Sequence, residues 1–516
     1  MGRRASGRAG LWTVSCVAPF LLAVPVLAGP APDLLAPLKA LESRGARVGA
    51  IMSRGDRVLA AHRADEPRNP ASVSKVFTGA AALDRLGPEF RFVTTSWRFA
   101  SGGKDGVAIR ASGDPTLTRK SLEEMARCLQ QQGVRRIARL VLDPGGLDPG
   151  ATPPRFDRKA TLAPYRAGAA PFQVDLGAVT LTVRPGKPGE PTSASLSTTS
   201  DRVVLDNRSV TAGGSSPGAR KDPFRVRARE DPDGRLVIQV SGRLSGRRVH
   251  VESFRVPDPQ GHALGAFQQA LKDAGIAVSS AGQPGTVPPG AREVCRVESA
   301  PLAEILVPMI RDSLNPVAEA ILRELGRPAG KGEAPRVGFA GGVTALHRFL
   351  RDQVGIPEAG ARFRNGSGLY DANEVTPEAT VHLLRWVRAQ PWFPVFRETL
   401  AVAGADTGTM RRRLKGSPLE GRVRAKTGTL DRVVSLAGYL ELPDGDPVEF
   451  AFLVEGPPCP SEGRKCPGWD RNEVRGAMDR ALVGLWNTLV ESGSAQHDSR
   501  QVSGGQVPTQ FQRGGP

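Results

Sequence analysis

The chain has 516 residues, of which 40% are hydrophobic and 24% are charged, and its formal net charge is +18. This length suffices for several domains, and a mean hydropathy of −0.25 excludes both a polytopic membrane protein and a largely disordered chain. The positive charge favours anionic partners such as acidic polymers, acidic lipid or nucleic acid. A generally basic, arginine-rich proteome explains the same charge equally well, because no long run of like charges occurs.

Residues 1–28 are typical of a secretory signal peptide. Three arginines precede an apolar stretch at residues 11–26, and small residues suit cleavage after Ala28. An uncleaved anchor is the alternative, but the stretch is short and two prolines interrupt it. A lipoprotein site at Cys16 is a further alternative, which the preceding residues disfavour. We therefore expect a periplasmic or otherwise extracytoplasmic protein with at most peripheral membrane contact, which removes nucleic acid as a partner.

Four cysteines follow the signal peptide, and an oxidising compartment allows them to pair. Cys459 and Cys466 flank a short loop that contains proline and glycine, so we expect a local disulfide between them. The sequence leaves open whether Cys128 pairs with Cys295. The six histidines are scattered without metal-ligand spacing, so no metal site is expected.

Apolar periodicity predicts the elements in chain order. Residues 46–53 and 58–62 alternate around a turn and indicate a β-hairpin, and residues 71–83 have helical spacing. Residues 98–258 consist of short β-like runs between turn residues, including a hairpin at 224–228 and 236–240. The remaining predictions are helices at 262–274, 302–310 and 314–325, strands at 422–427, 433–442 and 448–454, and a helix at 472–489.

These patterns divide the chain into five parts. They are a signal peptide at 1–28, the first part of a core at 29–97, an inserted β-rich region at 98–258, the second part of the core at 259–491, and a disordered tail at 492–516. The fold class is therefore α+β with several domains.

The predicted helix at residues 71–83 carries the first candidate catalytic pair. Ser72 and Lys75 lie three positions apart and so on one helix face. A serine hydroxyl needs a neighbouring base, and without a nearby histidine that base must be a lysine with a depressed pKa. Ser101 and Lys104 have the same spacing but flank two glycines, so we interpret that pair as a chance match.

Two further motifs follow in order. Ser313-Leu314-Asn315 lies between two predicted helices, and Lys426-Thr427-Gly428-Thr429 lies on a predicted strand. A Ser-x-x-Lys, a Ser-x-Asn and a Lys-Thr-Gly in this order are the signature of penicillin-binding proteins and class A β-lactamases. We expect Ser313 to relay a proton to the leaving amine and Asn315 to orient the substrate amide. The structural alternative is that both side chains cap the helix that follows.

The third motif supplies the groups that bind substrate. Lys426 and Thr427 offer a cation and a hydroxyl to a substrate carboxylate, and Gly428 lets the substrate approach the backbone. The backbone N–H groups of Ser72 and Thr429 would form the oxyanion hole. The structural alternative is that Lys426 is a solvated lysine at a strand edge.

Four segments together resemble the class C low-molecular-mass penicillin-binding proteins, the exported D-Ala-D-Ala carboxypeptidases and endopeptidases. They are residues 69–92 around Ser72, SGDPTL at 112–117, NGSGL at 365–369, and AKTGTLDRVVSLAGYL at 425–440. The resemblance covers most of residues 34–490. It implies a penicillin-binding/β-lactamase-like core, with an antiparallel sheet flanked by helices and a helical subdomain, interrupted by a mostly β insertion.

The resemblance implies a serine-type D-Ala-D-Ala carboxypeptidase or DD-endopeptidase that acts on peptidoglycan stem peptides through an acyl-enzyme at Ser72. β-Lactams would be covalent inhibitors, and no cofactor is implied. The chain departs from the family at Leu314 and Asn365, where aspartate is usual, and it lacks an aromatic-rich stretch after Leu142. We therefore assign no peptide contacts to the insertion.

Two alternatives remain at this point. A serine β-lactamase is disfavoured by the long gap between the first and second motifs, because the resemblance places extra domains in that gap. A non-catalytic peptidoglycan-binding protein is disfavoured by the intact set of Ser72, Lys75 and Lys426.

Overall fold

The computed structural model describes residues 33–156, 161–213, 222–328, 337–370, 372–458 and 469–501, the last eleven as backbone only. The predicted signal peptide, the Cys459 and Cys466 pair and residues 502–516 lie outside the described residues. All elements below belong to the unit Leu34–Pro516. None of the helices among the described residues has the length and apolar character needed to span a bilayer.

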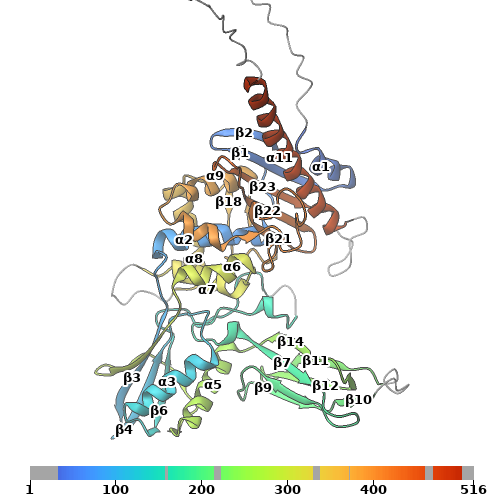
Figure 1. The fold of residues 1–516 in the computed structure, drawn as a ribbon. Helices are drawn as coiled ribbons and strands as arrows, with labels where there is room; N and C mark the ends of the chain where they lie inside the picture. The colour runs from blue at the N-terminus through green and yellow to red at the C-terminus, as the bar shows by residue number, and fades with distance from the viewer. Residues whose placement is uncertain are drawn as a thin grey trace, which may run out of the picture. The chain divides into compact units, whose positions relative to one another are not determined.

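A six-stranded antiparallel sheet joins the two ends of the chain (Figure 1). Its order is β2-β1-β23-β22-β21-β20, with β1 (Arg47–Arg54), β2 (Arg57–His62), β20 (Ala401–Val402), β21 (Val423–Thr429), β22 (Val433–Leu440) and β23 (Val448–Glu455). The predicted hairpin and the three predicted C-terminal strands therefore form one sheet, because β1 pairs with β23 from Arg47↔Glu455 to Ser53↔Glu449.

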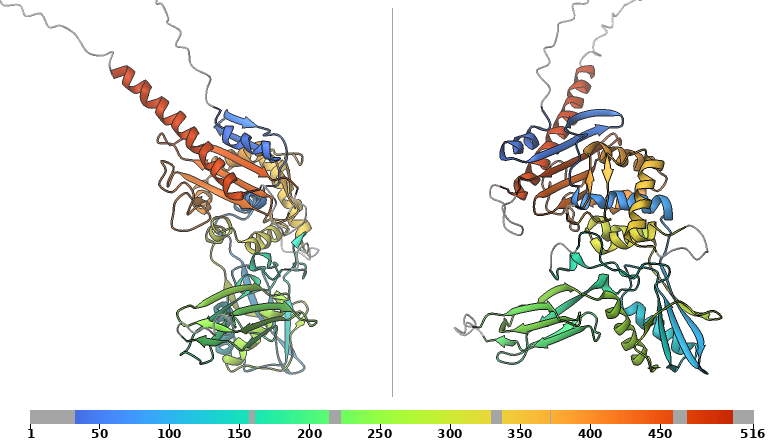
Figure 2. Two further views of the ribbon diagram at one scale, coloured as in Figure 1. Left: turned by 90° about the vertical axis from the view of Figure 1, so that its right-hand side faces the viewer. Right: turned by 180° about the vertical axis from the view of Figure 1, so that it is seen from behind.

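The sheet buries both of its faces. Along β22, Val434 and Leu436 belong to one apolar cluster, and Ala437 and Tyr439 belong to another, as the alternation of side chains along a strand requires. The first cluster includes residues of α1 (Ala36–Lys39) and α11 (Arg471–Gln501), and the second includes residues of α2 (Ser74–Leu86) and α9 (Pro377–Arg388). Figure 2 shows α11 lying along the sheet.

Further helices surround α2 in the second cluster. They are α6 (Leu302–Arg311), α7 (Asn315–Leu325), α8 (Phe339–Phe349), continued by η6 (Leu350–Val354), and α10 (Phe393–Thr399). Every residue of α7 is buried, including the polar residues Asn315, Glu319 and Arg323, which follow one another at intervals of four. This interval places them on one face of the helix. The predicted helices at 302–310 and 314–325 are confirmed.

The inserted region contains a mixed five-stranded sheet in the order β16-β6-β4-β3-β17. Its strands are β3 (Val93–Ser101), β4 (Lys104–Arg110), β6 (Arg139–Asp143), β16 (Gln283–Pro284) and β17 (Arg292–Glu298), with the short pair β5 (Arg136–Ile137) and β15 (Ala277–Val278) beside it. Helices α3 (Arg119–Gln131) and α5 (Pro259–Asp273) share an apolar cluster with this sheet.

A second, all-β part has its own apolar cluster. One sheet has the order β14-β7-β8 and another has the order β11-β12-β9, while β10 pairs with β13. The bounds are β7 (Ala178–Arg184), β8 (Ser193–Leu196), β9 (Val203–Asn207), β10 (Val210–Ala212), β11 (Arg225–Glu230), β12 (Leu236–Ser241), β13 (Arg243–Ser245) and β14 (His250–Arg255). The predicted hairpin at 224–228 and 236–240 is confirmed as β11 and β12.

The strand pairing corrects the predicted boundaries of the insertion at 98 and 258. Because β17 pairs with β3 from Arg292↔Arg98 to Glu298↔Val93, residues up to Glu298 belong with the inserted sheet and not with the core. The insertion is also not mostly β throughout, because α3 and α5 pack on its first sheet. Helical periodicity at 262–274 identified α5 without indicating which sheet it would cover.

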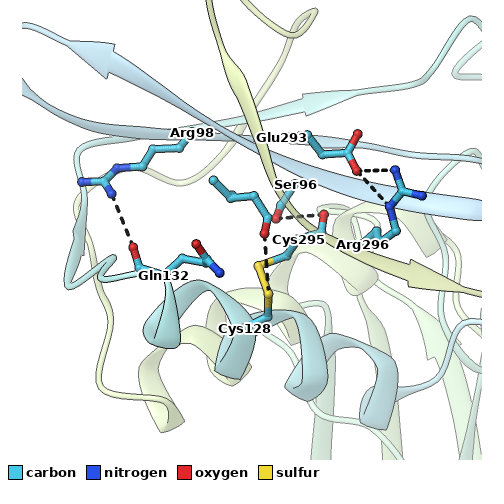
Figure 3. Close-up of a disulfide and its surroundings, with 8 residues drawn as sticks. Ser96, Arg98, Cys128, Gln132, Glu293, Cys295 and Arg296 are labelled. Atoms are coloured by element: carbon cyan, nitrogen blue, oxygen red, sulfur yellow. Dashed lines mark hydrogen bonds and ion pairs between the residues drawn. A yellow bond between two sulfur atoms is a disulfide. The ribbon is translucent and has the colours of Figure 1, made fainter.

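Cys128 of α3 and Cys295 of β17 form a disulfide across a sequence separation of 167 residues, with a Cα–Cα distance of 6.1 Å. Figure 3 shows this disulfide between helix α3 and β17, an edge strand of the inserted sheet. The pairing that the sequence left open is therefore present in the structure.

The C-terminal helix is longer than predicted, because α11 runs through Gln501 and not to residue 489. Residues 492–501, predicted to be part of a disordered tail, are thus helical. The remaining elements are η1 (Ala40–Arg44), η2 (Ala71–Val73), η4 (Pro164–Arg166), η5 (Asp175–Gly177), β18 (Ala361–Arg362) and β19 (Glu374–Val375).

Candidate active site

Ser72 lies in η2, the single turn that leads into α2. Local polar contacts fix this turn: Ala71 N donates to Asn69 Oδ1 at 2.8 Å, and Ser435 Oγ of β22 donates to Pro70 O at 2.6 Å. Ala71 itself has a φ of 46°, a conformation that residues with a side chain seldom adopt. The sheet and the turn therefore hold the Ser72 segment in one place.

Lys75 is completely buried and contacts groups from three separate segments of the chain. Its Nζ lies 3.0 Å from Ser72 Oγ, 2.7 Å from Asn315 Oδ1 and 2.8 Å from the carbonyl oxygen of Ser367. The amine is thus within proton-transfer distance of the Ser72 hydroxyl. The first and second sequence motifs meet at this atom.

Ser313 and Lys426 form the other half of the site. Lys426 is also completely buried, and its Nζ donates to Ser313 Oγ at 3.0 Å and to Thr427 O at 2.6 Å. The alternative of a solvated strand-edge lysine is therefore wrong. Ser313 has a φ of 69°, so the link between α6 and α7 holds this serine in the strained left-handed region.

Asn315 is the first residue of α7 and does not act as a helix cap. Leu314 stands at the cap position of α7, and no side chain caps this end. The Asn315 amide instead joins two partners: Oδ1 faces Lys75, and Nδ2 donates to Tyr165 O at 2.9 Å. A backbone carbonyl of the insertion thus fixes which end of the amide faces the lysine.

Glu319, one turn further along α7, was not identified from the sequence. Its fully buried carboxylate accepts hydrogen bonds from Gly366 N at 3.1 Å and from Ser367 N at 2.8 Å. These bonds position the Ser367 carbonyl that contacts Lys75. The spacing of polar residues at Asn315, Glu319 and Arg323 on a largely apolar helix was the signal that could have revealed this residue.

Asn365 shapes the same loop from within. Its Oδ1 accepts from Gly368 N at 2.9 Å, and its Nδ2 donates to Leu369 O at 3.1 Å. Asn373 adds a second clamp, because its Nδ2 donates both to Asn365 O and to Ser74 Oγ at 2.9 Å. Asparagine in place of the family's usual aspartate therefore supplies both an acceptor and a donor to the loop.

Two glycines permit the close approach of backbones around Ser72. A Cβ on Gly428 would lie 2.0 Å from Ser435 Oγ and 2.7 Å from Pro70 O. Gly368 has a φ of 77°, and a Cβ there would lie 1.8 Å from Ala71 O. Both positions therefore exclude a side chain. Gly428 precedes Thr429 on β21, so this close approach lies beside the end of the third motif.

Burial sets the protonation of both lysines. It lowers the pKa of Lys75 well below the ordinary value; the nearby Lys426 cation lowers it further, whereas Glu319 raises it. Burial lowers the pKa of Lys426 to about 7, against a raising effect of Asp312. The pKa of Glu319 is raised by burial, and the bonds from Ser367 and Gly366 oppose this. Lys75 is therefore suited to accept a proton near neutral pH.

The last part of β21 has an open edge. β20 pairs with β21 only at Ala425 and Arg424, so among the described strands none pairs with residues 426–429 on that side. Thr427 is partly buried and Thr429 is exposed. An extended peptide could add to such an edge through backbone hydrogen bonds.

The Ser101 and Lys104 pair lies elsewhere, at the turn between β3 and β4 in the inserted sheet. It has no part in the site, in agreement with its interpretation as a chance match. Among the described residues, no group of three or more His, Cys, Asp or Glu side chains could hold a metal ion.

Comparisons with known proteins give several matches along most of the chain. Residues 36–472 match the family model described as the D-Ala-D-Ala carboxypeptidase 3 (S13) family. The chain is 31% identical over 410 residues to a D-alanyl-D-alanine carboxypeptidase of an Actinomadura species, covering 75% of this chain and 72% of the relative. It is 26% identical over 428 residues to the D-alanyl-D-alanine carboxypeptidase DacB of Haemophilus influenzae, covering 80% of this chain and 86% of the relative.

The fold also matches a solved structure. The crystal structure of penicillin binding protein 4 from Haemophilus influenzae superposes with a TM-score of 0.70 at 23% identity, covering 88% of this chain and 99% of that one. A second structure of that protein, in complex with a β-lactam, gives a TM-score of 0.65 at 24% identity and covers the same shares of the two chains. These matches show a shared penicillin-binding-protein fold, insertion included.

Proposed function

Because the chain belongs to the D-Ala-D-Ala carboxypeptidase 3 (S13) family and is a serine-type D-Ala-D-Ala carboxypeptidase/endopeptidase, we propose that Ser72 is its nucleophile and Lys75 its general base. The observation that carries this assignment is the 3.0 Å contact between Lys75 Nζ and Ser72 Oγ at a fully buried amine. The proposed substrates are peptidoglycan stem peptides that end in D-Ala-D-Ala, or cross-links that contain D-Ala.

Acylation follows from these distances. Neutral Lys75 takes the hydroxyl proton of Ser72 while Oγ attacks the carbonyl carbon of the penultimate D-Ala. The backbone N–H groups of Ser72 and Thr429 stabilise the oxyanion that forms. The C–N bond then breaks, and the terminal D-Ala leaves as its amine.

Ser313 is placed to return a proton to the leaving nitrogen. Its hydroxyl oxygen accepts a hydrogen bond from Lys426, so its own O–H proton is free to be donated. The proton that Lys75 took from Ser72 then replaces it on Ser313, so the leaving amine gains one proton and Lys75 is neutral again before water attacks. Asn315, with its amide orientation fixed by Tyr165 O, holds Lys75 and the substrate amide. Water then attacks the ester at Ser72, releases the shortened peptide and restores the free serine.

Lys426, Thr427 and Thr429 form the proposed binding strand. The substrate extends along the open edge of residues 426–429, and the Lys426 cation and the Thr427 hydroxyl attract its carboxylate. No cofactor enters this scheme. β-Lactams, whose strained amide resembles the scissile bond, would acylate Ser72 in the same way.

The proposed location is periplasmic or otherwise extracytoplasmic. Residues 1–28 have the pattern of a secretory signal peptide, and the Cys128–Cys295 disulfide suits an oxidising compartment. In such a compartment the peptidoglycan substrate is directly accessible, and the net positive charge favours contact with acidic envelope polymers.

Labelling with a fluorescent penicillin tests the assignment. Wild-type protein, Ser72→Ala and the control Ser101→Ala are incubated with the label, and the modified peptide is located by mass mapping. We expect label on Ser72 in the wild type and in Ser101→Ala, and none in Ser72→Ala. Label elsewhere, or none at all, would refute the nucleophile.

Two assays then separate the substrates. Release of D-Ala from a pentapeptide measures carboxypeptidase activity, and cleavage of a cross-linked dimer measures endopeptidase activity. Rapid turnover of the penicillin label would instead indicate a β-lactamase.

A further inference from the structure

A cavity in the all-β part of the insertion is lined by none of the motif residues. Its volume is about 720 Å³, within the range of about 300–1,000 Å³ that is typical of sites for small ligands. Strands β11 and β14 form two of its walls, and residues 161–164 form a third. The two strands are outer strands of different sheets, and Figure 1 shows them next to each other. The cavity therefore separates two strand edges.

The cavity follows the edge of β14. Side chains alternate between the two faces of a strand, so Phe254 and Arg255 point to opposite sides, yet both line the cavity. Val226 and Ala228 of β11 line the opposite wall, and both pack on the apolar cluster that includes Phe254. The cavity is thus a cleft with an apolar floor and a strand edge on each side, a form that accepts an extended peptide.

Arg255 offers a cation to a ligand in this cleft. Its Nε donates to Thr161 O at 2.9 Å, and no carboxylate of the described residues lies within 4.0 Å of its guanidinium group. Burial and the neighbouring cation Arg166 lower the pKa of Arg255. Glu230 and Tyr370 oppose this shift. A bound carboxylate would offset both the burial of the charge and the repulsion from Arg166.

Two carboxylates line the cleft, one from each strand. Glu230 ends β11, Glu252 lies within β14, and both residues are exposed. Glu252 lies 3.0 Å from His250 Nε2, whereas Glu230 forms no ion pair with any residue that the structure describes. The cleft therefore offers acids to a ligand amine as well as a cation to a ligand carboxylate. It fits a peptide that carries both charges.

The third wall of the cleft continues into the Ser72 site. Thr161 O accepts a second hydrogen bond, from Arg166 Nη1 at 2.9 Å. Residues 161–164 are followed directly by Tyr165, whose carbonyl oxygen accepts from Asn315. A ligand held on this wall would thus lie beside the segment that contacts the catalytic centre.

We propose that this cleft binds a second stem peptide of the peptidoglycan polymer, one that is not being cleaved. The proposal rests on the proposed function, because it takes the ligand from the same polymer. A stem peptide carries alanine methyl groups, free carboxylates and the amine of its diamino acid, which match the apolar floor, Arg255 and the two glutamates. Holding one stem peptide keeps its neighbours concentrated near Ser72, so polymeric peptidoglycan becomes a better substrate than free peptides.

Titration calorimetry with a short peptide tests the cleft directly. The probe is N-acetyl-L-Ala-γ-D-Glu-L-Lys, or the same peptide with meso-diaminopimelate as its third residue, and the protein is full-length Ser72→Ala. We expect saturable binding of at least one probe. Ala228→Phe, added to this protein, fills the cleft from β11 and should weaken binding at least about 10-fold.

Val204→Phe is the matched control. It adds the same ring to the outer face of the same sheet, where Val204 is 39% exposed, and should keep the affinity within about 2-fold.

A second test uses the activity of the protein with Ser72 intact. Release of D-Ala is compared on insoluble peptidoglycan rich in pentapeptides and on a free pentapeptide. Ala228→Phe should lose about 10-fold or more on the polymer and stay within about 2-fold on the free peptide. Penicillin labelling of Ser72 at the wild-type rate shows that this variant is folded.

The outcomes separate the cleft from the proposed function. Absence of binding by both probes, equal affinity in Ala228→Phe, or an equal loss on both substrates would overturn the cleft and leave the peptidase assignment intact. Binding of glycan strands stripped of peptides, if Ala228→Phe abolishes it, would overturn the choice of a peptide ligand. If the wild type releases no D-Ala from either substrate, the proposed function fails, and the titration still decides whether the cleft binds a stem peptide.

Discussion

Asn315 and Glu319 lie one turn apart on the same buried face of α7, and both act on Lys75. Asn315 contacts the amine directly at 2.7 Å, whereas Glu319 holds the loop whose Ser367 carbonyl lies 2.8 Å from it. One helix therefore supplies Asn315 of the second sequence motif and supports a third contact to the proposed base. Glu319 acts through the backbone groups of Gly366 and Ser367, which form no sequence motif.

Replacing Glu319 should impair acylation more than folding. Glu319→Gln keeps the size of the side chain but turns an N–H donor towards a backbone N–H, so the loop at Ser367 shifts. We expect acylation by penicillin to slow at least about 10-fold. We also expect the free energy of unfolding to fall by roughly 1–3 kcal/mol relative to the wild type. Without the negative charge the pKa of Lys75 falls further, so the acid limb of the rate profile moves to lower pH.

Glu324→Gln is the control for this experiment. Glu324 lies on the same helix, is buried and pairs with Arg327 at 2.5 Å, but does not contact the loop at Ser367. It should lose stability without a change in the pH profile of acylation. If the two variants behave alike, Glu319 has a purely structural role.

The rate of acylation should depend on pH through both lysines. Neutral Lys75 is the proposed active form, and its lowered pKa means that the rate should rise with pH well before the ordinary lysine range. Lys426 must be charged to attract a carboxylate, so this attraction weakens as pH rises through about 7. We expect a bell-shaped profile of kcat/KM whose two limbs belong to the coupled pair.

Lys426→Met separates the two limbs. It removes the alkaline limb and lowers kcat/KM for a carboxylate substrate by about 10-fold to 100-fold. It also removes a like charge beside Lys75, so the pKa of Lys75 rises and the acid limb moves to higher pH. An acid limb that stays in place would show that Lys75 and Lys426 do not interact as described.

The disulfide should stabilise the insertion without taking part in catalysis. Replacing both Cys128 and Cys295 by serine opens a link across 167 residues and should cost roughly 2–5 kcal/mol of stability. Thermal unfolding of the double variant and of the wild type measures this. Penicillin labelling of Ser72 should persist at temperatures where the variant is folded. Loss of labelling in the folded variant would contradict this prediction. It would mean that the disulfide is needed to keep Tyr165 O in place against Asn315.

The sequence predicted the elements that have a strong local period and the residues that belong to spaced motifs. The helix after Ser72, the strand at Lys426 and the link at Ser313 are of this kind, and the structure brings Ser72 to Lys75 and Ser313 to Lys426. Long-range pairing has no local period. The pairing of β3 with β17 could therefore not be predicted, and for this reason the predicted insertion boundaries at 98 and 258 differ from those in the structure.

The contacts that the sequence did not predict are of two kinds. The carbonyl groups of Tyr165 and Ser367 act through the backbone, which any residue type supplies, so their positions carry no compositional signal. Contacts between strands of different sheets are the second kind. The cavity between β11 and β14 arises only once their two sheets pack together, because each strand by itself has the pattern of an ordinary edge strand. Glu319 alone had a usable signal, its spacing from Asn315.

Gly428→Ala tests the close contact between β21 and the Ser72 segment. The added methyl group would lie 2.0 Å from Ser435 Oγ and 2.7 Å from Pro70 O, so strand and turn must separate. We expect roughly 1–3 kcal/mol of destabilisation, and at least about a 10-fold loss of acylation, because the proposed oxyanion site joins these two segments. Gly484→Ala is the control: its Cβ meets no atom within 4 Å, and alanine favours the helix, so stability should stay equal or rise. Normal acylation by Gly428→Ala would mean that the Thr429 N–H and the Ser72 N–H do not act as one oxyanion site.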